Sequence, residues 1–112
     1  MSYDEGLAER LRQSLQSRRD ISERKMFGGL AFMARGHMFI GIQGDVLMAR
    51  IGPEAYEEAL SSAHVRVMDF TGKPMKGYVY VDPPGTESDA DLSDWVRRCL
   101  HFAQSLPPKK LK

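Results

Sequence analysis

The chain of 112 residues has little cysteine, little net charge and no long hydrophobic run. Cys99 is the single cysteine, which excludes an intramolecular disulfide and a cysteine-rich zinc site and is typical of a reducing compartment. Uncharged stretches such as the one from Met26 to Ala34 are far too short to span a membrane. The first five residues are acidic, unlike a targeting segment. We therefore expect a cytoplasmic protein with no membrane partner.

The formal net charge is only +1, because the sequence has sixteen Lys and Arg residues and fifteen Asp and Glu residues. Domains that bind nucleic acid through phosphate contacts are usually strongly basic. Direct DNA binding is therefore expected to be weak or indirect, unless the charges are sorted onto separate faces. With 42% hydrophobic and 28% charged residues, the chain fits one globular domain over 1–112. Residues 107–112 form a short basic tail that we expect to be frayed.

The hydrophobic pattern predicts an α+β fold with the order α-β-β-β-α-β-β-α. Ser2 and Glu5 have the spacing of a capping box, and Ser88 and Asp91 have the same spacing before the last helix. We expect two layers, a five-stranded antiparallel sheet and the helices packed on it. Helices are predicted at 2–17, after 52–53 and from 88 to 106, and strands at 30–34, 37–42, 46–51, 65–70 and 77–81.

No constellation of residues indicates catalysis. The histidines His37, His64 and His101 are too far apart in sequence for a short metal-binding motif, and we expect each to be satisfied or solvent-facing. Cys99 lies on the apolar stripe of the last helix, which predicts a buried, inert thiol. The sequence therefore predicts no enzyme, no metal site and no cofactor, although a deep pocket around His37 or His64 would favour a ligand-binding domain.

Methionine is unusually frequent, and six of the seven residues lie in or beside the predicted strands. Methionine fills irregular cores and also lines adaptable binding surfaces. Core filling is the default interpretation, and a groove for a partner is the alternative.

Two segments carry a resemblance to a known family. Residues 25–33 read K-M-F-G-G-L-A-F-M, and residues 68–79 read M-D-F-T-G-K-P-M-K-G-Y-V. These signatures, with the chain from Tyr3 to Pro107, resemble the N-terminal domain of the TfoX/Sxy family. The resemblance implies a two-layer domain similar to type III secretion chaperones. It also implies a bacterial regulator of natural competence that acts as a coactivator with the cyclic-AMP receptor protein. Fuller members carry a C-terminal helical domain, whereas this sequence stops at Lys112.

The resemblance brings no catalytic residues, so the two signatures are interpreted first as fold determinants. Their glycines are expected to allow backbone geometries that a side chain would block. We also expect Met26, Phe27 and Met75 to line the place where the signatures meet, beside the basic pair Lys73 and Lys76. The candidate protein-contact residues are Met26, Phe27, Gly28, Gly29, Lys73, Met75, Lys76 and Gly77.

Three functions remain open at this point. The first is a non-enzymatic regulatory protein-interaction domain that acts in transcription through an activator such as the cyclic-AMP receptor protein. The second is a chaperone-like homodimer that binds another protein, which rests on fold analogy alone. The third is a small ligand-binding domain.

Overall fold

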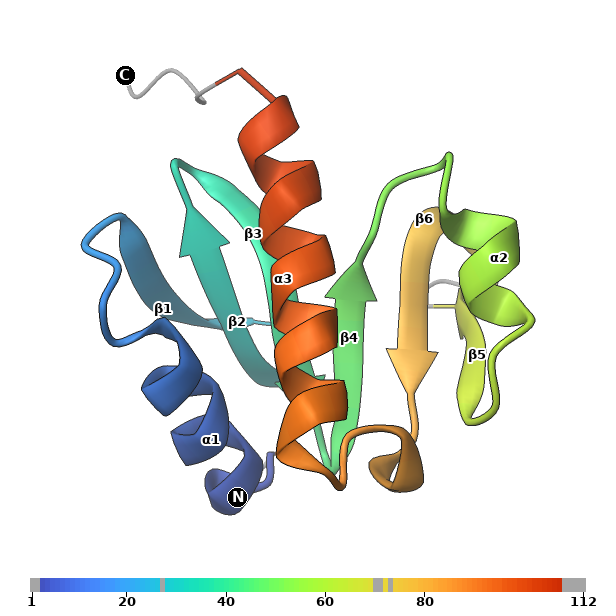
Figure 1. Ribbon diagram of the computed structural model, residues 1–112, viewed down its shortest axis with the longest axis horizontal. Coiled ribbons are helices and arrows are strands. Elements are labelled where there is room, and N and C mark those ends of the chain that lie inside the picture. Colours follow the sequence, from blue (N-terminus) through green and yellow to red (C-terminus); the bar gives the residue numbers. More distant parts are fainter. Residues whose placement is uncertain (1–2, 27, 70–71, 73, 108–112) are drawn as a thin grey trace.

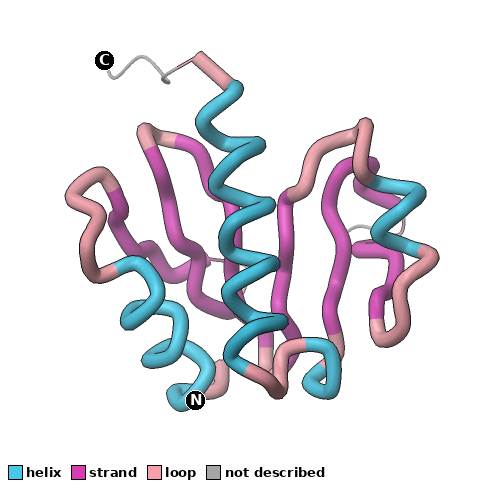
Figure 2. The backbone as a smooth tube through the Cα atoms, in the orientation of Figure 1, coloured by secondary structure: helices cyan, strands magenta, loops and turns pink. Residues whose placement is uncertain are grey.

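The computed structural model describes residues 3–26, 28–69, 72 and 74–107, with the backbone alone at Met26 and Pro74. One antiparallel sheet forms the first layer, and three helices on one of its faces form the second (Figures 1 and 2). The predicted α+β, two-layer architecture is confirmed. None of the helices in this part of the chain has the length and apolar character of a membrane span.

The sheet has the order β1-β2-β3-β4-β6-β5, and every neighbouring pair is antiparallel. The elements along the chain are α1 (Glu5–Leu15), β1 (Ile21–Met26), β2 (Gly29–Ala34), β3 (His37–Gln43), β4 (Val46–Arg50), α2 (Tyr56–Leu60), β5 (Val65–Asp69), β6 (Pro74–Val81), the 3-10 turn η1 (Pro83–Gly85) and α3 (Asp89–Ser105).

The predicted number of five strands is wrong, because β1 adds a sixth strand at one edge of the sheet. Its sequence, I-S-E-R-K-M, is mostly polar and lacks the apolar run of a buried strand. Only β2 pairs with it, from Ile21 opposite Ala34 to Met26 opposite Gly29. Polar residues on an edge strand discourage pairing with other chains. The strand is therefore specified by its neighbour rather than by its own hydrophobicity.

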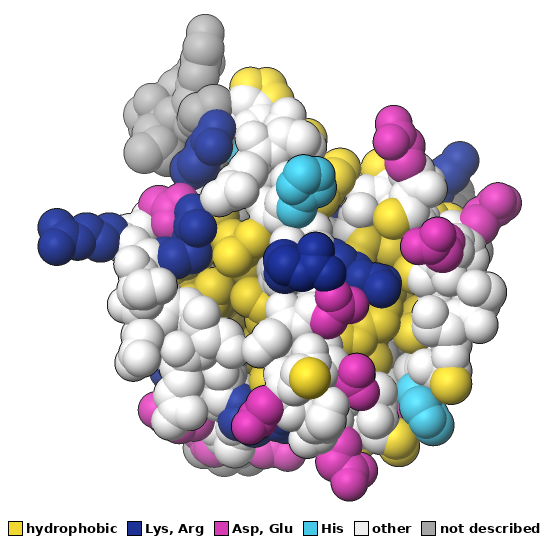
Figure 3. All heavy atoms as spheres, viewed as in Figure 1, with side chains coloured by type: hydrophobic (Ala, Val, Ile, Leu, Met, Phe, Trp, Pro, Cys, Tyr) yellow, Lys and Arg dark blue, Asp and Glu magenta, His cyan; other side chains and the backbone are white. Residues whose placement is uncertain are grey.

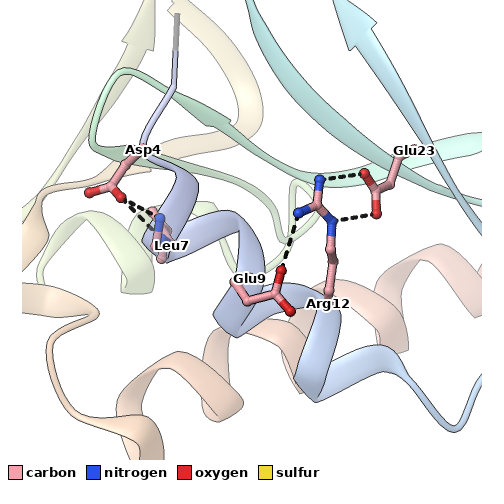
Figure 4. A network of polar contacts seen from close by, with 6 residues as sticks. Asp4, Leu7, Glu9, Arg12 and Glu23 are labelled. Carbon is pink, nitrogen blue, oxygen red and sulfur yellow. Dashed lines mark hydrogen bonds and ion pairs between the residues drawn. The ribbon is translucent and has the colours of Figure 1, made fainter. Parts of the chain in front are cut away.

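Helix α1 begins at Glu5 rather than at residue 2. The side chain of Asp4 caps it by accepting hydrogen bonds from the backbone N–H groups of Gly6, at 2.8 Å, and Leu7, at 3.2 Å (Figure 4). The predicted cap at Ser2 lies outside the described residues. The helix buries Leu7, Leu11 and Leu15, whose spacing of four residues places them on one face.

An ion-pair network ties α1 to the edge strand. Both Nε and Nη2 of Arg12 donate to the carboxylate of Glu23 in β1, at 2.8 and 2.9 Å (Figure 4). The guanidinium also donates to Glu9, at 3.4 Å. The hydrogen bond from Arg12 holds the pKa of Glu23 below its ordinary value. The network fixes β1 against the helical layer.

Helix α3 crosses the centre of the sheet (Figure 1). The hydroxyl of Ser88 accepts from the N–H of Asp91 at 3.0 Å, so the predicted start of this helix is confirmed. The side of α3 that faces the sheet buries Leu92, Trp95, Val96, Cys99 and Ala103. These side chains join α1 and the inner side of β2, β3, β4 and β6 in one core.

The opposite face of the sheet is also filled in part. Met48 and Met68 are completely or almost completely buried, and neither belongs to the core under the helices. A Cβ at Gly41 would lie 2.8 Å from the terminal methyl of Met48 and 3.3 Å from that of Met38. For Met48 and Met68, core filling is the correct interpretation.

Strand β5 keeps Val65 and Val67 on the same side of the sheet, because they pair with Val81 and Val79, which belong to the core under the helices. A register shift lies between Val67 and Asp69. Val65 is half-buried, Val67 is 40% exposed and Met68 is buried. Met68 is buried outside the core under the helices, whereas Val67 is partly uncovered on this edge strand.

Candidate functional site

The first signature forms the hairpin end between β1 and β2. Gly28 occupies the turn with φ +73°, and Gly29 begins β2 opposite Met26. A Cβ at Gly29 would lie 2.0 Å from the carbonyl oxygen of Ile42 in β3. The predicted role of this pair as a backbone requirement is therefore confirmed, since β3 approaches too closely for any side chain. Phe27 lies outside the described residues.

The second signature begins β6. Gly77 has φ +94°, and its carbonyl oxygen accepts hydrogen bonds from the N–H groups of Ile51, at 2.9 Å, and Gly52, at 3.1 Å. This arrangement joins the start of β6 to the end of β4. Met75 is half-buried and Lys76 is exposed, whereas Lys73 lies outside the described residues.

The structure does not bring the two signatures together. Gly29 lies at the end of the sheet where Gln43 faces Val46 and where Val81 ends β6. Met75 lies toward the opposite end of β6, and strands β2, β3 and β4 separate that strand from β1. The backbone positions of Met26 and Met75 are therefore separated by three strands.

A larger feature of the surface is a cleft between α3 and the segment that joins β4 to α2, which we call the α2–α3 cleft. Its volume is about 540 Å³, and Ile51 and Phe102 contribute apolar groups to its floor. A Cβ at Gly52 would lie 2.4 Å from the ring of Phe102, so the backbone at Gly52 packs directly on this ring. Figure 3 shows hydrophobic surface exposed beside α3 and between charged side chains.

The two walls of the α2–α3 cleft carry opposite charges. Glu54 and Glu58 line one side, which we call the glutamate wall. Arg97 and Arg98 line the other, which we call the arginine wall, and His101 lies beside them. Glu54 and Glu58 lie about forty positions before Arg97 and Arg98 in the sequence, and no local pattern indicates that they share a cleft.

The arginine wall is held in place from within α3. Asp94 forms ion pairs with both Arg97 and Arg98, the latter at 2.9 Å, and the Arg98 guanidinium lies 4.9 Å from the ring centre of Trp95. In contrast, Glu54 and Glu58 form no ion pair with any residue that the structure describes. The glutamate wall is therefore available to a cation from outside the fold.

A second groove, of about 420 Å³, runs along the other side of α3 toward α1. Val96 and Leu100 contribute its apolar part, and Arg97 and His101 also line it. The exposed ridge of α3 thus stands between two hollows. The residues that line both hollows come mainly from helices.

The remaining reactive groups are placed as the sequence suggested. Cys99 is completely buried, which raises the pKa of its thiol to about 12. The Nε2 atom of His37 lies 2.7 Å from the carbonyl oxygen of Pro107, and His64 is exposed in a turn with φ +68°. Within the described ranges, no three His, Cys, Asp or Glu side chains are grouped closely enough to hold a metal ion.

The family model of the TfoX N-terminal domain matches residues 13–103, which is most of the chain. The chain belongs to the TfoX N-terminal domain family. This confirms the resemblance of the two signatures, and the matched region of the TfoX N-terminal domain contains all six strands. Neither the curated proteins nor the solved structures give a match.

Proposed function

We propose that this TfoX N-terminal domain is a non-enzymatic regulatory domain that acts in the cytoplasm by contacting another protein. The observation that carries the proposal is the family match over residues 13–103, which contains all six strands, α2 and most of α3. Within the TfoX/Sxy family, that contact serves the transcription of competence genes, and the partner we expect is an activator such as the cyclic-AMP receptor protein. Contact with DNA is then indirect.

The chemistry of the domain supports a role without catalysis. A completely buried thiol with a raised pKa is a poor nucleophile, because the reactive thiolate is suppressed at neutral pH. The charged side chains that line the hollows beside α3 are exposed or half-buried, and none is a buried polar group aimed at a reacting atom. Open surfaces of this kind suit contact with a macromolecule.

For the contact we propose the beginning of β6, which holds the described part of the second signature. The exposed ammonium of Lys76 lies next in sequence to the half-buried Met75, and Gly77 fixes both against the end of β4. An adaptable apolar side chain beside a cation is a common composition for the edge of a protein interface.

The test measures binding of the purified domain to immobilised cyclic-AMP receptor protein by interferometry. We expect Lys76→Glu to weaken binding about tenfold, because it reverses a charge at the contact. The matched control is Lys25→Glu, which makes the same charge change at an exposed position of the edge strand β1, on the far side of the sheet from β6. Absence of binding by the unchanged domain, or equal losses for both variants, would contradict the proposal.

A homodimer is the second candidate function. The observation that favours it is the pair of oppositely charged walls in the α2–α3 cleft.

A further inference from the structure

We propose that the α2–α3 cleft is a dimerisation surface and that its occupant is a second copy of this chain. The proposal concerns the helical face, whereas the proposed regulatory contact lies at the start of β6. The two therefore stand or fall separately. Its basis is the arrangement of charge on the two sides of the cleft.

A surface with a positive strip beside a parallel negative strip can bind the same surface of a second copy through opposite charges. When a two-fold axis runs along the cleft, in the plane between two copies, the glutamate wall of each copy lies opposite the arginine wall of the other. Glu54 and Glu58 of each copy then meet Arg97 and Arg98 of its partner. The two-fold symmetry makes each contact occur twice in the dimer, so four carboxylates face four guanidinium groups.

The two walls differ in how far their side chains are already held in place by contacts within one copy. Asp94 and the ring of Trp95 hold the guanidinium groups in position, which reduces the entropy lost when they bind a partner. The carboxylates of Glu54 and Glu58 have no cation of their own among the described residues. The negative charge of the glutamate wall is therefore not neutralised within one copy, and the arginine wall of a second copy would neutralise it.

The floor of the cleft adds apolar contact between the walls. Ile51 is buried, whereas the ring of Phe102 is half-exposed and packs on Gly52. Among the described large hydrophobic side chains only Val67 is exposed, and it lies on β5 rather than in the cleft. The apolar part of the interface is consequently modest, so the dimer should be weak, concentration-dependent and sensitive to salt.

The experiment uses sedimentation equilibrium of the full chain from about 1 µM to about 1 mM, with two charge-reversal variants. Arg97→Glu with Arg98→Glu makes both walls negative, and Glu54→Lys with Glu58→Lys makes both positive. We expect the unchanged chain to dimerise and each variant alone to remain monomeric. An equal mixture of the two variants should associate again, because every wall then faces its opposite charge.

The control is Arg19→Glu with Arg24→Glu, which has the same charge change as the first variant at exposed positions outside the cleft. We expect it to dimerise like the unchanged chain, and circular dichroism checks that every variant is folded. A monomeric unchanged chain at all concentrations overturns the proposal. A dimer that survives in either variant, or folded variants that fail to associate when mixed, overturns the assignment of the surface.

Discussion

The close approach of β3 to Gly29 leads to a quantitative prediction about the first signature. In Gly29→Ala, the new Cβ would lie 2.0 Å from the carbonyl oxygen of Ile42, 3.0 Å from its carbonyl carbon and 3.2 Å from the Cα of Gln43. An ordinary contact needs about 3.5 Å, so β2 and β3 must separate by more than about 1 Å. The obstacle is backbone and cannot rotate away.

The neighbouring glycine provides the comparison. Gly28 has φ +73°, but nothing lies within 4 Å of a Cβ built there. Gly28→Ala therefore costs only the strain of a left-handed backbone, about 1–2 kcal/mol. Gly29→Ala must disrupt the pairing of β2 with β3, and we expect a cost of at least about 3 kcal/mol. A domain of this size has a total stability of about 5–15 kcal/mol, so this loss is large.

Urea unfolding of both variants measures the difference, with the fluorescence of Trp95, which is 7% exposed, as the signal. Hydrogen exchange at the amides of β2 and β3 shows where the loss occurs, and we expect faster exchange around Leu30 and Ile42, which are paired in the sheet. A free energy of unfolding for Gly29→Ala within about 0.5 kcal/mol of that for Gly28→Ala would refute the reasoning.

Two further predictions concern ionisable groups. Because burial raises the pKa of Cys99 to about 12, Ellman's reagent at pH 8 should label the thiol only as urea unfolds the chain, and rapid labelling of the folded protein would contradict this. Arg12 lowers the pKa of Glu23 in the folded state, so this pair stabilises the fold above the ordinary pKa of Glu23, 4.5, and the contribution is lost on acidification. Glu23→Gln should therefore reduce the free energy of unfolding near pH 7 by at most about 1 kcal/mol, since the pair is partly exposed, and urea titrations should show this difference vanish by about pH 2. A difference in the free energy of unfolding between the unchanged chain and Glu23→Gln that grows as the pH falls would contradict the stabilising role of the Arg12–Glu23 pair.

Sequence reasoning succeeded where a pattern is local. The apolar stripes of α1 and α3 repeat with the period of a helix, and the glycine-bearing turns separate β2, β3 and β4. The cap at Ser88 and the burial of Cys99 also follow from neighbouring residues. In each case the deciding contacts lie within a few positions along the chain.

The failures share a cause, which is dependence on distant partners. Strand β1 exists because Ile21–Met26 pairs with β2, although its own residues are polar. The separation of the two signatures follows from the strand order, which no segment encodes alone. The α2–α3 cleft joins residues 51–58 to residues 97–105, and a pattern within either segment describes only an ordinary helix surface.

The central position of α3 has a consequence for synthesis on the ribosome. The strands of the sheet precede this helix in the chain, and α3 supplies Leu92, Trp95, Val96, Cys99 and Ala103 to the core beneath it. While the chain emerges from its N-terminus, β2, β3 and β4 can pair in sequence, yet their inner side chains lack their main cover. The nascent domain thus exposes an apolar sheet face until its last helix has been made, and general chaperones that hold such faces should engage it before release.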